Sequence, residues 1–316
     1  MPQSGRNVDQ GRAVARVKGT TVEDDGRRAA DEHAITPVEA IRFGASMTAR
    51  AGSETPRLDV EVLLRHALQT DRVGLFARLN DPLPPEAAAA FLTLLGRRVA
   101  GEPIAYLVGE KEFMGLPIQV GPGALVPRPE TELLVEWGLR WLSNRSDAVV
   151  VDVGTGSGAI ALALAAGRPS STGTTIIAAD SSADALAWAA RNRWALALDR
   201  VHLVRGDLTD WLAPGAADLV VANLPYLTPD QIAGNPLLGA EPTGALLGGP
   251  DGLELVRRLV ADLPRILAPG GAVGLELDPS QTATVTTLLE ETLPGARIEL
   301  IADLAGLPRH VVAQGQ

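Results

Sequence analysis

The feature that most constrains the fold is an alternation of short apolar runs with longer segments of helical periodicity. Runs rich in β-branched residues predict strands, and apolar residues spaced three and four apart predict the helices between them. Alternation of this kind is typical of a doubly wound α/β sheet with ligands at the carboxyl ends of its strands. We expect strands at 149–153, 175–179, 201–204, 218–222 and 271–277 and near 298 and 310, with helices at 158–166, 183–196, 253–267 and 281–291.

The composition allows one large domain and a smaller one. The chain has 316 residues, of which 46% are hydrophobic, and a formal net charge of −10. An acidic chain has no global positive field, so we expect no direct nucleic-acid partner. The N-terminus has no signal-peptide core, and no apolar run approaches the roughly 18 residues of a membrane helix. We therefore expect a cytoplasmic protein with no membrane partner.

Covalent and metal chemistry is restricted by residue usage. The absence of cysteine excludes disulfides, thiolate zinc sites and a cysteine nucleophile. The four histidines are scattered and have no ligand spacing, so no metal is expected.

Shifts in composition and periodicity divide the chain into segments. In the helical part, Thr55 can cap a helix that has Pro56 at its first position. A hairpin is expected to turn near Gly115. The expected segments are a disordered extension (1–33), a small helical domain that recognises the substrate (34–103), a β-hairpin linker (104–127) and the catalytic α/β domain (128–316).

A stiff segment is expected at the start of the α/β domain, and we call residues 126–128 the strap. The sequence continues as Pro127-Arg-Pro-Glu-Thr-Glu132, and each residue before a proline is pushed toward extended geometry. A helix should begin near Pro129, with Glu130 and Glu132 against its positive end. Arg128 can steer a substrate carbonyl, or it can form a salt bridge within the linker.

A glycine-rich turn, Asp152-Val-Gly-Thr-Gly-Ser-Gly158, follows the first expected strand of the α/β domain and opens a helix. Glycines allow a tight turn and a close approach of backbone N–H groups to a ligand. With Ala159 the turn also fits a dinucleotide-binding pattern. Asp152 can face a cationic amino group beneath the turn, or it can merely order the turn.

Acidic residues also follow the next two strands. Asp180 can accept hydrogen bonds from both hydroxyls of a ribose, or it can cap the following helix. Asp207 can accept from an adenine amino group, or it can be an ordinary turn residue. The candidate cofactor-binding residues are Asp152, Gly154, Thr155, Gly156, Gly158, Asp180, Asp207 and Asn223.

The tetrapeptide Asn223-Leu224-Pro225-Tyr226 ends a strand that can lie beside the one before the glycine turn. The Asn223 side-chain oxygen and the Leu224 carbonyl can accept the two N–H groups of a carboxamide, which aims its nitrogen at an activated methyl group. Tyr226 can pack against the amide plane and exclude water. The tetrapeptide therefore predicts methyl transfer to nitrogen, with Asn223 and Tyr226 as the catalytic residues.

Together these motifs resemble the release factor glutamine methyltransferases, the PrmC/HemK family. The resemblance runs from about Thr36 to Val312 and is most specific at the proline-rich segment. It implies a Rossmann-like, seven-stranded S-adenosylmethionine-dependent methyltransferase domain with a small N-terminal helical domain. It also implies a monomer that methylates the glutamine in the Gly-Gly-Gln motif of class I peptide-chain release factors. Besides the motifs above it rests on Glu112-Phe-Met-Gly115, Glu241-Pro242, Gly248-Gly-Pro-Asp-Gly-Leu253 and Asp303 to Arg309.

The resemblance further implies roles for single residues. Asn223 and Tyr226 would hold the glutamine, and Gly154, Gly156, Asp180 and Asp207 would bind the cofactor. Leu224 stands where the family has proline, and the resulting Asn-Leu-Pro-Tyr is similar to ribosomal RNA adenine dimethyltransferases. We expect activity to survive, because leucine keeps its carbonyl and Pro225 keeps it extended. The residues that would border the site are Arg128, Pro129, Glu130 and Thr131.

Three other functions remain as alternatives. An amino-methyltransferase acting on a nucleobase would need a flipped or unpaired base and a basic groove. A dinucleotide-dependent dehydrogenase would leave the tetrapeptide without a role. The third alternative is a partner protein that still binds the cofactor but lost its catalytic activity when the family's proline was replaced.

Overall fold

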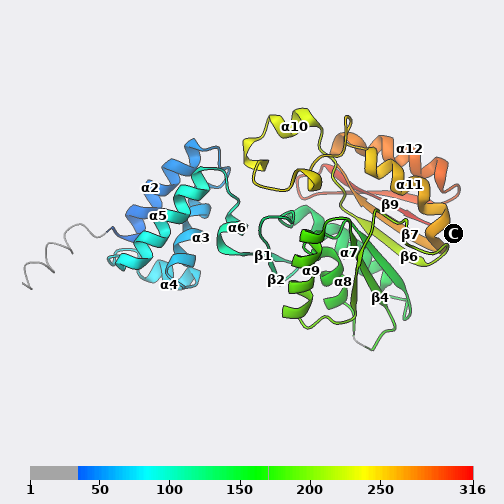
Figure 1. Ribbon diagram of the computed structural model, residues 1–316, viewed down its shortest axis with the longest axis horizontal. Coiled ribbons are helices and arrows are strands. Elements are labelled where there is room, and N and C mark those ends of the chain that lie inside the picture. Colours follow the sequence, from blue (N-terminus) through cyan, green and yellow to red (C-terminus); the bar gives the residue numbers. More distant parts are fainter. Residues whose placement is uncertain (1–34, 170, 316) are drawn as a thin grey trace, which may run out of the picture.

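The computed structural model describes residues 35–169 and 171–315. The expected disordered extension, residues 1–33, lies outside the described residues. A helical bundle forms one end of the molecule and a sheet covered by helices forms the other (Figure 1). The bundle consists of α2 (Pro37–Arg50), α3 (Pro56–Ala67), α4 (Arg72–Ala77), α5 (Pro85–Val99) and α6 (Ile104–Val108).

The bundle encloses its own apolar core, in which Leu63, Leu64 and Phe91 are fully buried. Thr55 precedes α3 as expected, but its side chain makes no capping hydrogen bond. Its hydroxyl donates instead to Asp59 Oδ1 at 3.0 Å. Thr55 thus occupies the predicted N-cap position, with Pro56 following it, but the expected capping hydrogen bond is not formed. The helical pattern also continues further than expected, because residues 104–108 of the predicted hairpin linker form α6.

A two-stranded hairpin connects the bundle to the α/β domain. Strands β1 (Glu110–Phe113) and β2 (Leu116–Gln119) pair antiparallel, and the turn between them has positive φ at Met114 and Gly115, 51° and 75°. Two successive positive φ angles are typical of the tight turns that match the twist of a hairpin. Asn192 exchanges hydrogen bonds with the backbone of Gln119 at 2.7 and 2.9 Å, which fixes the hairpin to the α/β domain.

The α/β domain is built on a seven-stranded sheet of order β5-β4-β3-β6-β7-β9-β8. All neighbouring strands are parallel except at β9, which runs antiparallel to β7 and β8. This confirms the predicted fold class. The strands are β3 (Val149–Val153), β4 (Thr175–Asp180), β5 (Val201–Arg205), β6 (Ala217–Ala222), β7 (Leu267–Glu276), β8 (Arg297–Ala302) and β9 (Pro308–Gln314).

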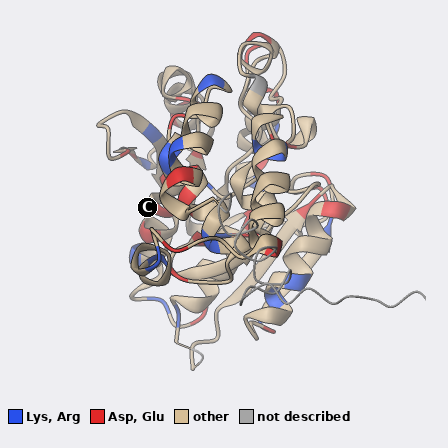
Figure 2. Ribbon diagram, turned by 90° about the vertical axis from the view of Figure 1, so that its left-hand side faces the viewer, with Lys and Arg blue, Asp and Glu red and all other residues tan. Residues whose placement is uncertain are grey.

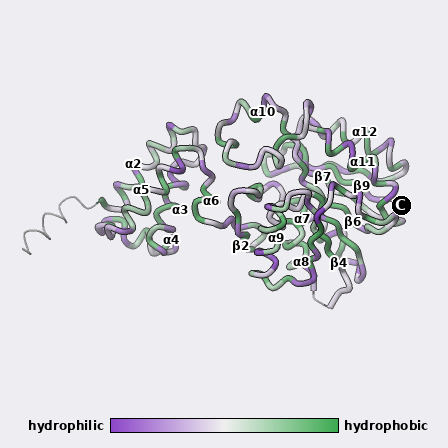
Figure 3. The backbone as a smooth tube through the Cα atoms, in the orientation of Figure 1, coloured by the Kyte–Doolittle hydropathy of each residue, from purple (hydrophilic) through white to green (hydrophobic). Residues whose placement is uncertain are grey.

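Helices cover both faces of the sheet, and green, hydrophobic stretches of the chain run through the helices and strands (Figure 3). Each face has its own cluster of buried residues, one including Leu134 and Leu164 and the other Leu259 and Leu289. Helices α7 (Glu132–Leu142) and α8 (Ala159–Ala166) belong to the first face, where α9 (Ala183–Ala195) lies beside α8 (Figure 1). Helices α11 (Glu254–Ile266) and α12 (Thr282–Thr292) belong to the second.

Two connections differ from a simple strand-to-helix link. The helix expected near Pro129 begins with a 3-10 turn, η1 (Pro129–Thr131), which leads directly into α7. A long connection joins β6 to α11 and lies between the bundle and the sheet helices (Figure 1). It contains α10 (Pro229–Ala233), η2 (Pro236–Leu238) and η3 (Thr243–Ala245), while η4 (Pro279–Gln281) precedes α12.

The central pair of strands brings the two predicted motifs to one edge of the sheet. β3 and β6 are parallel neighbours, and Val153 lies opposite Ala222. The glycine turn and the tetrapeptide therefore leave the sheet side by side.

Basic and acidic residues are interspersed along the ribbon in the view of Figure 2. In the described ranges no helix combines the length and hydrophobicity that crossing a membrane requires. Nor do the described residues form a group of three or more His, Asp or Glu side chains suited to a metal ion.

Candidate active site

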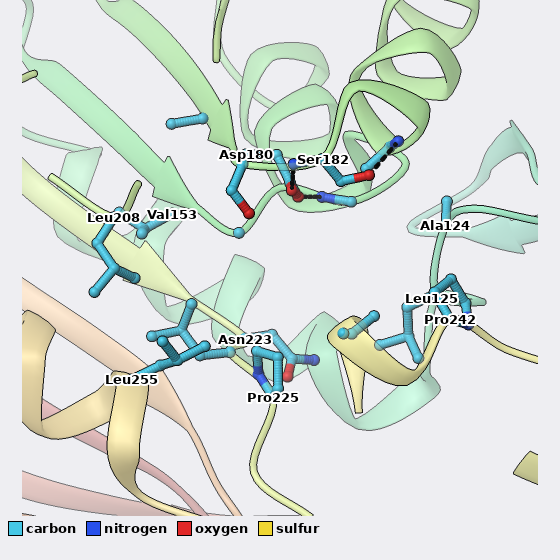
Figure 4. A pocket seen from close by; sticks show the side chains of 18 of the residues that line it. Ala124, Leu125, Val153, Asp180, Ser182, Leu208, Asn223, Pro225, Pro242 and Leu255 are labelled. Atoms are coloured by element: carbon cyan, nitrogen blue, oxygen red, sulfur yellow. Dashed lines mark hydrogen bonds between the residues drawn. The ribbon is translucent and has the colours of Figure 1, made fainter. Parts of the chain in front are cut away.

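A cavity of about 390 Å³ opens at the carboxyl edge of β3, β4 and β6. Asp180 and Ser182 lie on one side of it, and Asn223 and Pro225 lie across from them (Figure 4). Ala124 and Leu125, just before the strap, also line it, although the sequence did not single them out. Of the predicted cofactor-binding residues, those on the cavity wall are Gly154, Gly156, Asp180, Asp207 and Asn223.

The glycine turn lies against β4 and the tetrapeptide. The amides of Gly154 and Thr155 both donate to Ala179 O at 2.9 Å. Gly154 has a φ of 75°, and a Cβ there would approach Leu224 Cδ2 at 3.0 Å. Gly156 faces open space, because a Cβ at that position would meet nothing within 4 Å. The turn therefore leaves room for a ligand on one side and packs tightly on the other.

Asp180 is bound to the glycine turn and to the start of α9. Its Oδ2 accepts from the Gly156 amide at 2.9 Å, and its Oδ1 accepts from the Ser182 amide at 2.8 Å. The alternative role as a helix cap belongs to Ser182, whose hydroxyl accepts from the Ala185 amide. Each carboxylate oxygen has more than one acceptor site, so Asp180 keeps free capacity toward the cavity.

Asp152 lies behind the glycine turn and is fully buried. Its Oδ2 accepts from the Thr155 hydroxyl at 2.6 Å and from the Ala161 amide at 3.1 Å, so it orders the turn. Within the described chain its Oδ1 has no hydrogen-bond partner. Burial raises the pKa of Asp152 to about 7, and the two hydrogen bonds only partly offset this effect. A buried acceptor of this kind suits a cationic group.

Asp207 has a different environment from the other two acids. It is about half exposed and forms an ion pair with Arg258 Nη2 at 2.7 Å. Exposed pairs of this kind contribute little to stability. A ligand in the cavity can therefore compete with Arg258 for the carboxylate.

The tetrapeptide forms the wall between this cavity and a second one. The second cavity measures about 120 Å³ and shares Asn223, Leu224 and Pro225 with the first. Arg128 and Tyr226 line only the second. Leu224 turns its side chain into the core and is 4% exposed. Burial, followed by the charge of Glu276, raises the pKa of Tyr226 to about 12, so its phenol stays neutral.

Thr131 determines how Asn223 faces these cavities. Asn223 Nδ2 donates to Thr131 Oγ1 at 3.1 Å, and Thr131 is 3% exposed. The amide nitrogen is thus used within the protein, and Oδ1 is left for a ligand. Of the four residues expected to border the site, Arg128 lines the smaller cavity, while Thr131, Pro129 and Glu130 line neither. Thr131 is linked to the site only through its hydrogen bond with Asn223.

The corner formed by Pro225 and Tyr226 is held by residues that our sequence reasoning had not given a role. A Cβ on Gly248 would lie 2.4 Å from Pro225 O, and one on Gly252 would lie 2.1 Å from Tyr226 O. Gln281 Nε2 donates to Tyr226 O at 2.9 Å. The closely spaced glycines at 248, 249 and 252 were the available signal, whereas nothing in the sequence marked Gln281.

Comparisons with known proteins agree with this arrangement. A family model described as "PrmC N-terminal domain" matches residues 39–109, and one described as "Methyltransferase small domain" matches residues 130–236. A release factor glutamine methyltransferase from Rhodopirellula baltica is 38% identical over 87% of this chain and 94% of its own length. One from Bordetella pertussis is 42% identical over 80% of this chain and 93% of its own length.

Among solved structures, a protein-(glutamine-N5) methyltransferase (release factor-specific) from Alicyclobacillus acidocaldarius is 31% identical to this chain. The match covers 63% of this chain and 99% of that chain, with a TM-score of 0.40.

Proposed function

We propose a mechanism from the premise that this chain belongs to the release factor glutamine methyltransferase family. It is an S-adenosylmethionine-dependent enzyme that methylates the side-chain amide nitrogen of a release-factor glutamine. The finer proposal is that the acceptor is the glutamine of the Gly-Gly-Gln motif in class I peptide-chain release factors. The observation that carries the proposal is the meeting of the two cavities at Asn223.

The larger cavity is the proposed site for S-adenosylmethionine, which supplies an activated methyl group on a sulfonium sulfur when bound. Asp180 would accept from the ribose hydroxyls, and Asp207 would accept from the adenine amino group in place of Arg258. The unpartnered Oδ1 of Asp152 is buried behind the turn, and from there its charge would stabilise the cationic amino group. Gly154 and Gly156 let the backbone of the turn approach the ligand, while Thr155 and Gly158 shape the turn behind it.

The smaller cavity is the proposed site for the acceptor glutamine. Asn223 Oδ1 and the Leu224 carbonyl accept the two N–H groups of the carboxamide and hold its nitrogen toward the larger cavity. Tyr226 packs against the amide plane and keeps water away. Each neutral hydrogen bond contributes about 1 kcal/mol, and the contribution grows when water is excluded. Positioning of this kind needs neither a metal nor a covalent intermediate.

Methyl transfer from labelled S-adenosylmethionine tests the proposal. The purified protein is incubated with a release factor, with the same factor carrying Gln→Ala in the Gly-Gly-Gln motif, and with ribosomal RNA. We expect label only in the unaltered release factor. Label in the RNA would support the nucleobase alternative suggested by Asn-Leu-Pro-Tyr, and label in neither substrate would support a protein that only binds the cofactor.

A further inference from the structure

The smaller cavity contains one charged side chain, Arg128, among the described residues that line it. The side chain of Arg128 is 34% exposed, so it has access to both protein and ligand. Apolar residues such as Leu238 and Leu246 make up much of the remaining wall. Arg128 is therefore the strongest hydrogen-bond donor available to a molecule that enters this cavity.

Glu241, in the connection between β6 and α11, holds Arg128 from the other side. Its side chain is 3% exposed, and its Oε1 accepts a hydrogen bond from Arg128 Nη2. Its Oε2 accepts from the Val126 amide at 3.0 Å. One buried carboxylate thus binds the strap twice, once through its backbone and once through the guanidinium.

The strap is held again upstream of these contacts. The Tyr106 hydroxyl donates to Ala124 O, and Leu125 lines both cavities. Rotation of the strap would therefore break hydrogen bonds on both sides of Leu125. Because a guanidinium loses little further freedom when its plane is already fixed, Arg128 is preorganised for a second partner.

The donors of Arg128 are only partly used. A guanidinium has five N–H groups in a fixed fork, and within the described part of the chain the guanidinium of Arg128 makes its one hydrogen bond through Nη2. A glutamine within a polypeptide brings backbone carbonyls into the cavity together with its carboxamide. Those carbonyls lose water on binding and need a donor.

We propose that Arg128 binds a main-chain carbonyl of the release factor beside the acceptor glutamine, and that Glu241 is the positioning residue for this contact. The inference rests on the proposed function and adds how the acceptor is selected. The pair distinguishes a glutamine within a polypeptide from a free carboxamide, because only the former offers the carbonyl.

Steady-state methylation of a release factor tests the pair with Arg128→Ala, Arg128→Lys and Glu241→Gln. Loss of a hydrogen bond from a charged donor corresponds to about tenfold to hundredfold in affinity. We expect Arg128→Ala to raise KM for the release factor by this factor and to change kcat by less than about threefold. Glu241→Gln should raise KM less, because its amide oxygen can still accept from Val126. Guanidinium ion added to Arg128→Ala should lower KM again, which a merely structural role would not produce.

Asp262→Asn is the matched control. Asp262 pairs with Arg265 at 2.6 Å and lies in α11, outside the lining of both cavities. This control should lower thermal stability without changing KM. Arg128→Lys keeps the positive charge but loses the planar set of N–H donors. It replaces Arg128→Ala in the same measurement if the alanine variant does not fold.

The outcomes separate the two proposals. An unaltered enzyme that does not methylate the release factor overturns the proposed function. An active enzyme whose Arg128 and Glu241 variants change only stability, or only kcat, overturns the assignment of the carbonyl contact.

Discussion

The hydrogen bond from Asn223 Nδ2 to Thr131 Oγ1, 3.1 Å long, joins the end of β6 to the 3-10 turn that begins α7. A carboxamide has a donor end and an acceptor end, and both orientations fit the same space. Because Thr131 uses the nitrogen, Asn223 presents its oxygen toward the cavities. An interaction within the protein thereby holds Asn223 with its oxygen available to accept from a substrate N–H group.

Replacement of Thr131 by valine tests this relationship. Valine has a similar shape but no acceptor, so Asn223 loses its preferred orientation and kcat should fall about tenfold, the equivalent of one hydrogen bond of about 1.4 kcal/mol. Thr131→Ser keeps the hydroxyl and should retain most of the activity. Affinity for S-adenosylmethionine, measured by calorimetry, should be similar in both variants. Equal rates for the serine and valine variants would contradict the role of the hydroxyl.

Asp152 predicts a pH dependence of stability in the ligand-free protein. Its pKa is about 7 in the fold, against 3.8 for an aspartate carboxyl in water, so the folded protein holds an extra proton between these values. Protonation of Asp152 therefore favours the folded state. This contribution to the free energy of unfolding is complete below about pH 4 and is lost as the pH rises through about 7. Asp152→Asn should remove this component of the pH profile. Denaturant unfolding across that range measures it, and identical slopes for the two proteins would contradict it.

Cofactor affinity should change with pH in the opposite direction. A cationic amino group favours the ionised form of Asp152, so the Kd for S-adenosylmethionine should fall as the pH rises toward 7, by up to about tenfold per pH unit. Calorimetry with the unaltered protein and with Asp152→Asn provides the measurement. The variant should bind more weakly, with a flatter profile. A Kd of the unaltered protein that does not change below pH 7 would show that Asp152 does not meet the cation.

Leu224 lacks the fixed backbone angle of the family's proline, but its side chain makes packing contacts that proline would not make. Proline at this position would fix φ, whereas the leucine side chain is 4% exposed and packs beside Gly154. Leu224→Pro should therefore change kcat by less than about fivefold, since the backbone effect is only about 0.4–1 kcal/mol. Loss of the buried side chain should lower the free energy of unfolding by about 1–3 kcal/mol. A dead enzyme that gained activity on this change would contradict the expectation.

Much of the α/β domain was predictable because strand and helix periodicities were strong and uninterrupted. The predicted strand at 149–153 matches β3, and the pairing of β3 with β6 follows from the usual behaviour of parallel sheets. Boundaries were less accurate where glycine and proline obscured the pattern. β7 begins at Leu267, ahead of the expected residue 271, because Pro269 and Gly270 lie within the strand.

Contacts between segments that are distant in the sequence could not be predicted, because no local sequence pattern encodes them. From the sequence, Arg128 could form a salt bridge within the linker or contact the substrate. The structure shows a salt bridge, and its partner is Glu241, which lies far away in the sequence. Gln281 reaches Tyr226 from the start of α12 by a hydrogen bond that only the assembled sheet allows. Local chemistry was enough to propose the acceptor and cofactor motifs, but the residues that orient them depend on tertiary packing.

Gly252 provides the sharpest test of how the acceptor corner is held. Its φ is 75°, and a Cβ there would lie 2.1 Å from Tyr226 O and 2.3 Å from Gln281 Nε2. Gly252→Ala must therefore displace the corner. A displacement of about 1 Å in a positioned group can cost about a hundredfold in rate. We expect kcat to fall by about that factor, with a smaller change in the Kd for S-adenosylmethionine.

Gly115→Ala is the matched control for backbone strain. Gly115 also has a φ of 75°, but a Cβ there would meet nothing within 4 Å. Both variants carry the strain of a left-handed residue, about 1–2 kcal/mol, and only Gly252→Ala displaces the tetrapeptide. The two proteins should lose comparable stability from strain, while only Gly252→Ala loses kcat. Equal activity in the two variants would mean that the Gly248–Gly252 turn does not hold the Tyr226 backbone in its catalytic position.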